Sequence, residues 1–362
     1  MPSLKRLGIL TAGGDCPGLN AVIRAVVKTA LRRNPPVQVI GILDGYAGLV
    51  ENRTHPLREN DVSGILVRGG TILGTSNRDN PFHYLSAPVS RPRDRSKDAL
   101  ATIRRLKLDG LIAVGGDGTL RCAQEFERLG VRVIGVPKTI DNDLSGTDVT
   151  FGFDSALATA TDAVDRLHTT AESHHRVLIC EVMGRYAGWI ALQAGMAGGG
   201  DVILLPEIPF DMKKVCASIH NREKRGRRFS IVVVAEGAKI AGGALVTQGH
   251  FQGADKRPRL GGISHHIAAE IEKRTGTEAR VVILGHLQRG GIPTARDRWL
   301  ATRFGVHAVD LAGESRWGQM VNIRGTHFGE IPIAQAVAQL RRVDPSGEEI
   351  RAARSVGTSF GD

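Results

Sequence analysis

Residues 133–143 have the sequence VIGVPKTIDND, in which an apolar run is followed by two carboxylates spaced two residues apart. A short apolar run bounded by polar residues is typical of a buried strand. The residues after such a strand form a loop at its carboxyl end, which is where open α/β sheets bind their ligands. The pattern therefore predicts a loop that carries Asp141 and Asp143 out of the edge of a parallel sheet.

Two further apolar runs end in loops rich in glycine and aspartate. Residues 7–10 lead into Thr11-Ala12-Gly13-Gly14-Asp15, and residues 111–114 lead into Gly115-Gly116-Asp117-Gly118-Thr119. These two loops offer backbone amides for phosphate and a carboxylate for a metal ion, while the loop at 139–143 offers a base. Phosphoryl transfer requires those components.

Strand-like and helical patterns alternate along the whole chain. Strands are predicted at 7–10, 37–43, 111–114, 133–136, 177–182, 202–205, 231–235 and 281–284. Helices are predicted near 19–31, 120–129 and 155–168, and at 331–354 with a break at 345–347. This alternation predicts an α/β fold with mostly parallel sheets covered by helices. At 362 residues the chain is long enough for two lobes, with a boundary near 139–150.

The composition is that of an ordinary globular protein, with 41% hydrophobic residues and a formal net charge of +11. Basic residues concentrate at 91–97 and 222–228, without the interleaved aromatics that favour nucleic-acid binding. The four cysteines have no CxxC spacing, which indicates reduced thiols rather than disulfides or a zinc site. Without a signal-peptide pattern or a membrane-length apolar run, we expect a cytoplasmic protein that binds neither nucleic acid nor membrane.

Each loop has a chemical interpretation and a plainer structural one. Residues 13–18 open a helix whose free amides favour anions, or form a simple tight turn; they lack the Lys-Ser/Thr end of a P-loop. Asp117 is suited to Mg²⁺, or to capping a helix. Asp141 is suited as a general base, with Asp143 as its electrostatic partner and Thr139 as a hydrogen-bond donor to phosphate. The alternative for these three is an Asx-rich turn.

Basic side chains also lie near predicted strand ends: Arg176, Arg185, Arg280, His286 and Arg289. Arginine suits phosphate because its fork bonds two oxygens at once. The set exceeds the need of one phosphate, so some members are expected to be structural or to serve a neighbouring subunit. Glu236 follows another predicted strand and could accept a hydrogen bond from a sugar hydroxyl, or could simply begin a helix.

Seven motifs, taken in order, resemble the phosphofructokinase family from the first strand to about residue 312. They are LTAGGDCPGLNAVIR (10–24), RGGTILGTS (68–76), VGGDGT (114–119), PKTIDND (137–143), EVMGRYAGW (181–189), VVAEG (233–237) and ILGHLQRGG (283–291). The combination is highly specific. With this resemblance we expect two Rossmann-like lobes with the active site in the cleft between them. The expected division is a nucleotide-binding lobe of residues 1–140 plus about 288–338, a sugar-phosphate lobe of 141–287, and a C-terminal extension of 339–362.

The resemblance implies transfer of a phosphoryl group from Mg²⁺-bound ATP to the 1-hydroxyl of fructose 6-phosphate, giving fructose 1,6-bisphosphate. Asp141 would accept the proton, Asp117 would bind Mg²⁺, and Thr139, Asp143 and Arg185 would complete the catalytic set. The implied ATP-binding residues are Gly13, Asn77, Arg78, Gly116, Asp117, Gly118 and Thr119. The implied sugar-phosphate residues are Thr139, Ile140, Asp141, Met183, Gly184, Arg185, Glu236, His286, Leu287, Gln288 and Arg289. Arg176 and Arg280 would reach in from an adjacent subunit, which implies a homotetramer or at least a homodimer.

Two positions bear on the phosphoryl donor. Family members that use pyrophosphate typically carry an acid at the position of Gly118 and a lysine at the position of Lys138. This chain therefore combines an ATP-type glycine with a pyrophosphate-type lysine. An acid after Asp117 would crowd and repel the α-phosphate, whereas glycine admits it. We expect ATP, with pyrophosphate as the alternative donor.

Other interpretations account for fewer motifs. Lipid and nicotinamide-dinucleotide kinases share the Gly-Gly-Asp-Gly loop, but they do not need the double-aspartate loop together with residues 286–289. A catalytically idle effector-binding subunit would be expected to lack Asp117 or Asp141. Arg24 and Lys28 match the helix that binds effectors in bacterial members, but His168 replaces a third basic residue, so control by an effector is left open.

Overall fold

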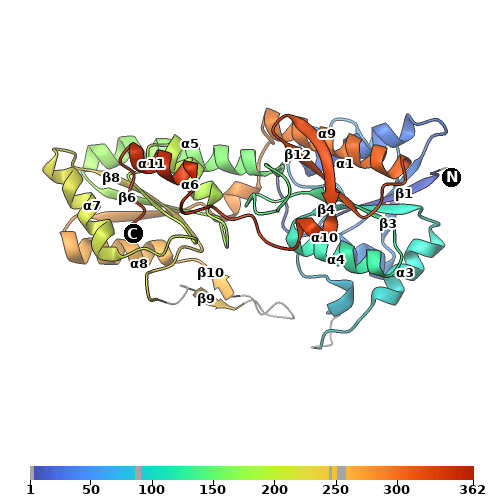
Figure 1. The fold of residues 1–362 in the computed structure, drawn as a ribbon, viewed down its shortest axis with the longest axis horizontal. Coiled ribbons are helices and arrows are strands. Elements are labelled where there is room, and N and C mark those ends of the chain that lie inside the picture. Colours follow the sequence, from blue (N-terminus) through green and yellow to red (C-terminus); the bar gives the residue numbers. More distant parts are fainter. Residues whose placement is uncertain (1–3, 86–90, 244–246, 251–257) are drawn as a thin grey trace.

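The computed structural model describes residues 4–85, 91–243, 247–250 and 258–362. Figure 1 shows two main sheets placed one beyond the other along the long axis of the molecule, each covered by helices on both faces. The predicted α/β class is confirmed.

The larger sheet has the strand order β13-β12-β5-β4-β1-β2-β3. The inner five strands are parallel, whereas β3 and β13 pair antiparallel at the two edges. Its strands are β1 (Arg6–Thr11), β2 (Gln38–Ile42), β3 (Thr54–Leu57), β4 (Gly110–Gly115), β5 (Val133–Pro137), β12 (Gln319–Arg324) and β13 (His327–Pro332).

Alternate residues of a strand point to opposite faces, so each face of this sheet has its own helical cover. Leu7 and Ile9 share a core with α1 (Leu19–Leu31) and α9 (Ala295–Gly313). Leu10 shares a core with the helices of the other face, which are α2 (Tyr46–Glu51), α3 (Ser96–Arg105), α4 (Asp117–Arg128) and α10 (Ile333–Ala336).

The smaller sheet has the order β11-β6-β8-β7 and is entirely parallel. Its strands are β6 (Val177–Val182), β7 (Val202–Leu204), β8 (Ser230–Ala235) and β11 (Ala279–Ile283). One face packs on α5 (Phe153–His174) and α6 (Trp189–Ala197), and the other on α7 (Met212–Lys224) and α8 (Ile263–Thr275). The core that includes α5 and α6 is continuous with the core around α1 and α9, so the two sheets share one apolar interior. Shorter elements are β9 (Thr247–His250), β10 (Pro258–Leu260), η1 (Asn60–Val62), η2 (Pro81–His83) and η3 (Gly285–Arg289).

The C-terminal segment passes from the larger sheet to the smaller one. It includes α11 (Glu348–Ser355), and beyond this helix Ser359 pairs in parallel with Val202 of β7 while Phe360 is fully buried. The predicted helix at 331–354 is therefore wrong over most of its length, since only 333–336 and 348–355 are α-helical. Among the helices that the structure describes, none is long and apolar enough to cross a membrane.

Candidate active site

The carboxyl ends of three adjacent parallel strands bring the three predicted loops together. Ala12 N donates to Val114 O (3.0 Å), which ties the loop after β1 to the end of β4. Lys138 N donates to Gly115 O (3.0 Å), which ties the loop after β5 to the same strand end. These backbone bonds hold the glycine loop at 13–15, the loop at 115–119 and the double-aspartate loop at 139–143 along one sheet edge.

The double-aspartate loop is organised by Thr139. Its hydroxyl accepts from Asp141 N (3.1 Å) and donates to Asp143 Oδ1 (3.2 Å). Between the two acids, Asn142 adopts a left-handed backbone conformation (φ 52°), and its Oδ1 accepts from Thr150 N (3.0 Å). Asp141 Oδ1 is shielded from solvent and has no hydrogen-bond partner within the described residues. The loop therefore offers an acceptor oxygen that no described residue uses.

The acids near this loop are difficult to ionise. Burial raises the pKa of Asp141, an effect opposed by the cations of Arg289, Lys138 and Arg185. Burial, and then the charge of Asp141, raises the pKa of Asp143 to about 7. Burial raises the pKa of Glu236 to about 7 as well, and the charge of Asp141 contributes to that shift. A carboxyl whose pKa lies close to neutrality is well matched to general base catalysis.

The glycine loop lies against a buried ammonium group. Gly13 has a positive φ of 81°, and a Cβ there would lie 3.4 Å from Lys138 Nζ. Lys138 is only 3% exposed and donates from Nζ to Gly14 O. Burial lowers the pKa of Lys138. Lys138 therefore supports the loop by donating a hydrogen bond to its Gly14 carbonyl.

Asp117 is the first residue of α4. Its Oδ2 accepts from Arg121 Nε (2.9 Å), while its Oδ1 is shielded and has no hydrogen-bond partner in the described chain. A Cβ on the neighbouring Gly118 would meet nothing within 4 Å. No group of three or more His, Cys, Asp or Glu side chains able to hold a metal ion occurs among the described residues. A carboxylate oxygen that no described residue bonds nevertheless suits Mg²⁺, because this ion is usually held by one or two carboxylates together with substrate phosphates and water.

Besides Thr139, Ile140 and Asp141 on the double-aspartate loop, most of the predicted sugar-phosphate residues follow the carboxyl ends of β6, β8 and β11. Met183 N donates to Gln288 Oε1 (3.4 Å), and Gly237 N donates to Gly184 O (3.1 Å), so the loops after these strands bind one another. Arg289 Nη1 donates to Asp15 O (3.1 Å), which brings a predicted phosphate-binding arginine to the glycine loop.

The structure separates the predicted residues by exposure. His286 is exposed and Leu287 is 70% exposed, whereas Ile140 and Gln288 are buried. Gln288 also donates to Gly285 O (3.2 Å), so its side chain is engaged within the protein. Asn77 and Arg78 are exposed; they follow Ser76, whose carbonyl accepts from Gly13 N (2.9 Å).

Arg176 and Arg280 do not lie with the other predicted residues. Arg176 precedes β6 and Arg280 is near the start of β11, so both are at the amino ends of their strands. Both contact Glu278, Arg176 at 2.6 Å. A six-residue strand spans about 20 Å, which separates these arginines from Met183 at the other end of β6.

Comparison with known proteins shows which family this chain belongs to. The family model described as Phosphofructokinase matches residues 6–312. The chain belongs to the phosphofructokinase family. Its relatives include the ATP-dependent 6-phosphofructokinase of Chloroflexus aggregans, 51% identical over 99% of this chain and 98% of that protein. They also include the pyrophosphate–fructose 6-phosphate 1-phosphotransferase of Streptomyces coelicolor, 51% identical over 98% of this chain and all of that protein.

Solved structures of phosphofructokinases have the same fold. The phosphofructokinase of Pichia pastoris in the T-state matches with a TM-score of 0.81 at 30% identity, over 99% of this chain and 37% of that longer chain. The pyrophosphate-dependent enzyme of Marinobacter aquaeolei matches with a TM-score of 0.80 at 22% identity, over 98% of this chain and 88% of that one. The second likeness concerns the fold only.

Two residues that support this candidate site were not predicted. The Tyr46 hydroxyl donates to Thr119 O (2.8 Å), and the Thr150 hydroxyl donates to Thr139 O (2.7 Å). Tyr46 is 73 positions from its partner in the chain, and no local pattern marks it. Thr150 lies within the expected lobe boundary, but nothing in that segment indicates that it fastens the loop before it.

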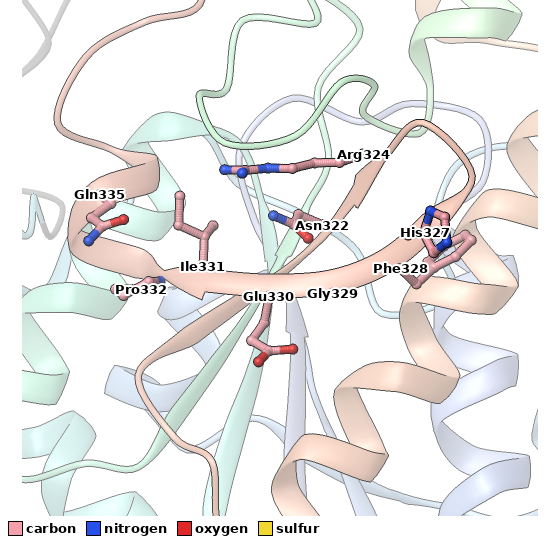
Figure 2. A pocket seen from close by; sticks show the side chains of 9 residues that line it. All are labelled: Asn322, Arg324, His327, Phe328, Gly329, Glu330, Ile331, Pro332 and Gln335. Carbon is pink, nitrogen blue, oxygen red and sulfur yellow. The ribbon is translucent and has the colours of Figure 1, made fainter.

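A separate hollow of about 360 Å³ lies on the β12–β13 hairpin (Figure 2). Figure 2 shows Arg324, Asn322, Ile331 and Gln335 around it, with His327 and Phe328 toward the hairpin turn. None of the predicted active-site residues lines this hollow.

Proposed function

We propose that this chain transfers the terminal phosphoryl group of ATP to the 1-hydroxyl of fructose 6-phosphate, giving fructose 1,6-bisphosphate and ADP. The observation that carries the proposal is the Asp141 carboxylate oxygen, shielded and unpartnered among described residues, on a loop joined through β4 to two glycine loops. That oxygen would accept the proton of the attacking hydroxyl. The nearby cations, including Arg289 and Arg185, would offset the negative charge that gathers in the transition state.

We assign nucleotide binding to the larger sheet and sugar-phosphate binding to the smaller one. The amides of the loops at 13–15 and 116–119 would hold the polyphosphate, in the manner of helix N-termini that bind anions. Asp117 would hold Mg²⁺, which supplies charge neutralisation for the transferred group. Glu236, Met183 and Arg289 would orient the sugar phosphate so that its hydroxyl faces Asp141.

The open space at Gly118 supports ATP as the donor. A nucleotide needs room at that position for the α-phosphate, and a Cβ there meets no atom within 4 Å. Lys138, the pyrophosphate-type residue, is already bonded to Gly14 O, so its side chain is part of the loop support. The relative from Streptomyces coelicolor makes pyrophosphate the alternative to test.

Initial rates of fructose 1,6-bisphosphate formation, with Mg²⁺ and either ATP or pyrophosphate, test the proposal. We expect turnover with ATP to exceed turnover with pyrophosphate by at least about tenfold. A faster reaction with pyrophosphate would identify pyrophosphate as the donor. The absence of a reaction with either donor would refute the proposed function.

We also propose that Arg176 and Arg280 complete the active site of an adjacent subunit in a homotetramer or homodimer. Their place at the amino ends of β6 and β11 supports this, because they lie far from the carboxyl-end site of their own chain. Sedimentation, together with activity regained by mixing an Arg176→Ala chain with an Asp141→Ala chain, tests it. We place the enzyme in the cytoplasm, and the four buried free cysteines suit that reducing compartment.

A further inference from the structure

The segment at 339–343, here called the C-terminal strap, lies directly against the double-aspartate loop. Leu340 pairs antiparallel with Leu144, and Ser145 Oγ donates to Gln339 O (2.9 Å). Arg341 N donates to Asp143 O (2.8 Å). The strap therefore acts as a short extra strand along the residues that follow Asp141.

The side chain of Arg341 adds a second attachment to the same loop. Its Nη1 donates to Asn142 O (3.2 Å), the carbonyl between the two candidate catalytic acids. The carbonyls of Asn142 and Asp143 thus both bond to Arg341, one to its side chain and one to its backbone. Arg341 is partly buried, and this burial lowers the pKa of its guanidinium.

The strap also holds the loop that carries the predicted sugar-phosphate residues. The Arg341 guanidinium lies 4.1 Å from the centre of the Trp189 ring, and Trp189 Nε1 donates to Arg341 O (3.0 Å). Glu207 accepts from both Gly188 N (3.0 Å) and Val343 N (2.9 Å). Because residues 183–188 immediately precede Trp189, the strap joins the base-bearing loop to the sugar-phosphate loop.

We propose that Arg341 is a positioning residue, which sets the distance between Asp141 and the sugar phosphate by clamping both loops to the C-terminal strap. This inference rests on the proposed function for its catalytic consequence. Displacing a reacting group by about 1 Å can lower turnover by about 100-fold, so a clamp outside the site can control the rate without touching substrate.

Arg341→Met is the main test, because methionine keeps an apolar contact with Trp189 and removes the charge and the side-chain donor. We expect kcat to fall by about 10- to 100-fold. We expect the Kd for ATP to stay within about twofold, because the strap bonds described here do not reach residues 13–15 or 115–119. Arg341→Lys, which retains a cation and a donor, should recover kcat to within about fivefold of the parent.

Arg351→Met is the matched control. Arg351 belongs to the same C-terminal segment and also donates to a backbone carbonyl, that of Ser346 (2.7 Å), but it is exposed and bonds within its own turn. Its variant should keep the parent kcat. A kcat for Arg341→Met within about threefold of the parent, or an equal loss in the control, would overturn the proposal.

Hydrogen exchange makes the proposal testable apart from catalysis. In Arg341→Met, amide exchange should quicken in peptides covering 139–150 and 183–189 and remain unchanged in peptides covering α1. A parent chain inactive on fructose 6-phosphate would refute the proposed function, while unchanged exchange in those peptides would refute the clamp. If Arg341→Met does not fold, Trp189→Phe serves instead. The Trp189→Phe substitution removes the hydrogen bond to Arg341 O. We expect a smaller fall in kcat and the same local change in amide exchange. Unchanged amide exchange in this variant would contradict the clamp.

Discussion

The proposed reaction requires an ionised carboxylate at Asp141, although the burial of this residue disfavours its charge. One of its oxygens is shielded and has no partner in the described part of the chain, and burial raises its pKa. A carboxylate oxygen that no described residue bonds can accept a hydrogen bond from a substrate hydroxyl and take its proton. The residue is therefore suited to chemistry rather than to holding the loop, a role that Thr139 performs.

We expect Asp141→Asn to lower kcat by about 10²- to 10⁴-fold, the usual contribution of a general base. Thermal stability should not fall, because the substitution removes a charge from a place where burial penalises it. Steady-state kinetics and a melting curve measure both. Asp162→Asn, which alters an exposed carboxylate paired with Arg166 at 2.8 Å, is the control. Turnover within a few-fold of the parent would remove Asp141 from the role of base.

Gly118 allows the donor to be tested at a single position. We expect Gly118→Asp to lower kcat/KM for ATP by at least about tenfold, and to affect pyrophosphate use far less, because the new carboxylate would repel the α-phosphate. The open space around this position predicts an intact fold. Gly118→Asn has the same size without the charge and separates crowding from repulsion. Equal losses with both donors would show that the argument about the α-phosphate is wrong.

Among the helices, α5 and α9 are joined by a buried carboxylate. Asp297, near the start of α9, is fully buried, and its Oδ2 accepts from Ser155 N (2.8 Å) and from the Ser155 hydroxyl (2.6 Å) at the start of α5. Burial raises the pKa of Asp297 to about 6. Since α5 follows the double-aspartate loop along the chain, this contact anchors the far end of the loop to the larger sheet through α9.

Asp297→Ala should therefore reduce the free energy of unfolding by roughly 2–4 kcal/mol, because it leaves two buried donors on Ser155 without their acceptor. Asp297→Asn retains an acceptor oxygen and should lose less than half of that amount. Urea unfolding at neutral pH measures the difference. Asp310→Ala, on the same helix with a partner at 3.5 Å and a half-exposed side chain, should change stability little. Equal losses of stability in the Asp297 and Asp310 variants would contradict a stabilising role for the contact between α5 and α9.

At the scale of the whole molecule, the acids of the site make stability depend on pH. The pKa of Asp143 and that of Glu236 are both raised to about 7. Between about pH 4 and pH 7 the folded chain holds protons at these two groups that the unfolded chain has released. Their contribution to stability is complete below about pH 4 and is lost as pH rises through about 7.

We expect a variant that combines Asp143→Asn and Glu236→Gln to lose the pH dependence of stability that these two groups create. Relative to the variant, the parent should lose free energy of unfolding between about pH 5 and about pH 8. Urea denaturation at both pH values measures the free energy of unfolding. Subtracting the value for the variant from that for the parent removes the contribution of histidines and surface acids. A parent that gains stability over this range relative to the variant would contradict the raised pKa values.

Most of the fold could be predicted because its signals are local. The strands predicted at 7–10, 111–114, 133–136, 177–182 and 231–235 correspond to β1, β4, β5, β6 and β8. The β12–β13 hairpin was not predicted. The helix predicted at 331–354 fails around Arg341, where the backbone instead bonds to the double-aspartate loop. The Arg341 side chain also bonds to Asn142 O, 199 positions away in the chain, and local periodicity carries no information about such contacts.

Chain order alone places the glycine loops and the two acids at one edge, because parallel strands put their carboxyl ends together wherever they pair. The phosphofructokinase family follows from the same motifs, and its model match confirms it. Three-dimensional packing decides the rest: Lys138 bonds to the glycine loop, Arg176 and Arg280 lie at the opposite strand ends, and the C-terminal strap joins two loops. These outcomes depend on contacts between distant segments, whose pairing is chosen by burial and hydrogen bonding across the assembled sheets rather than by the residues beside them in the chain.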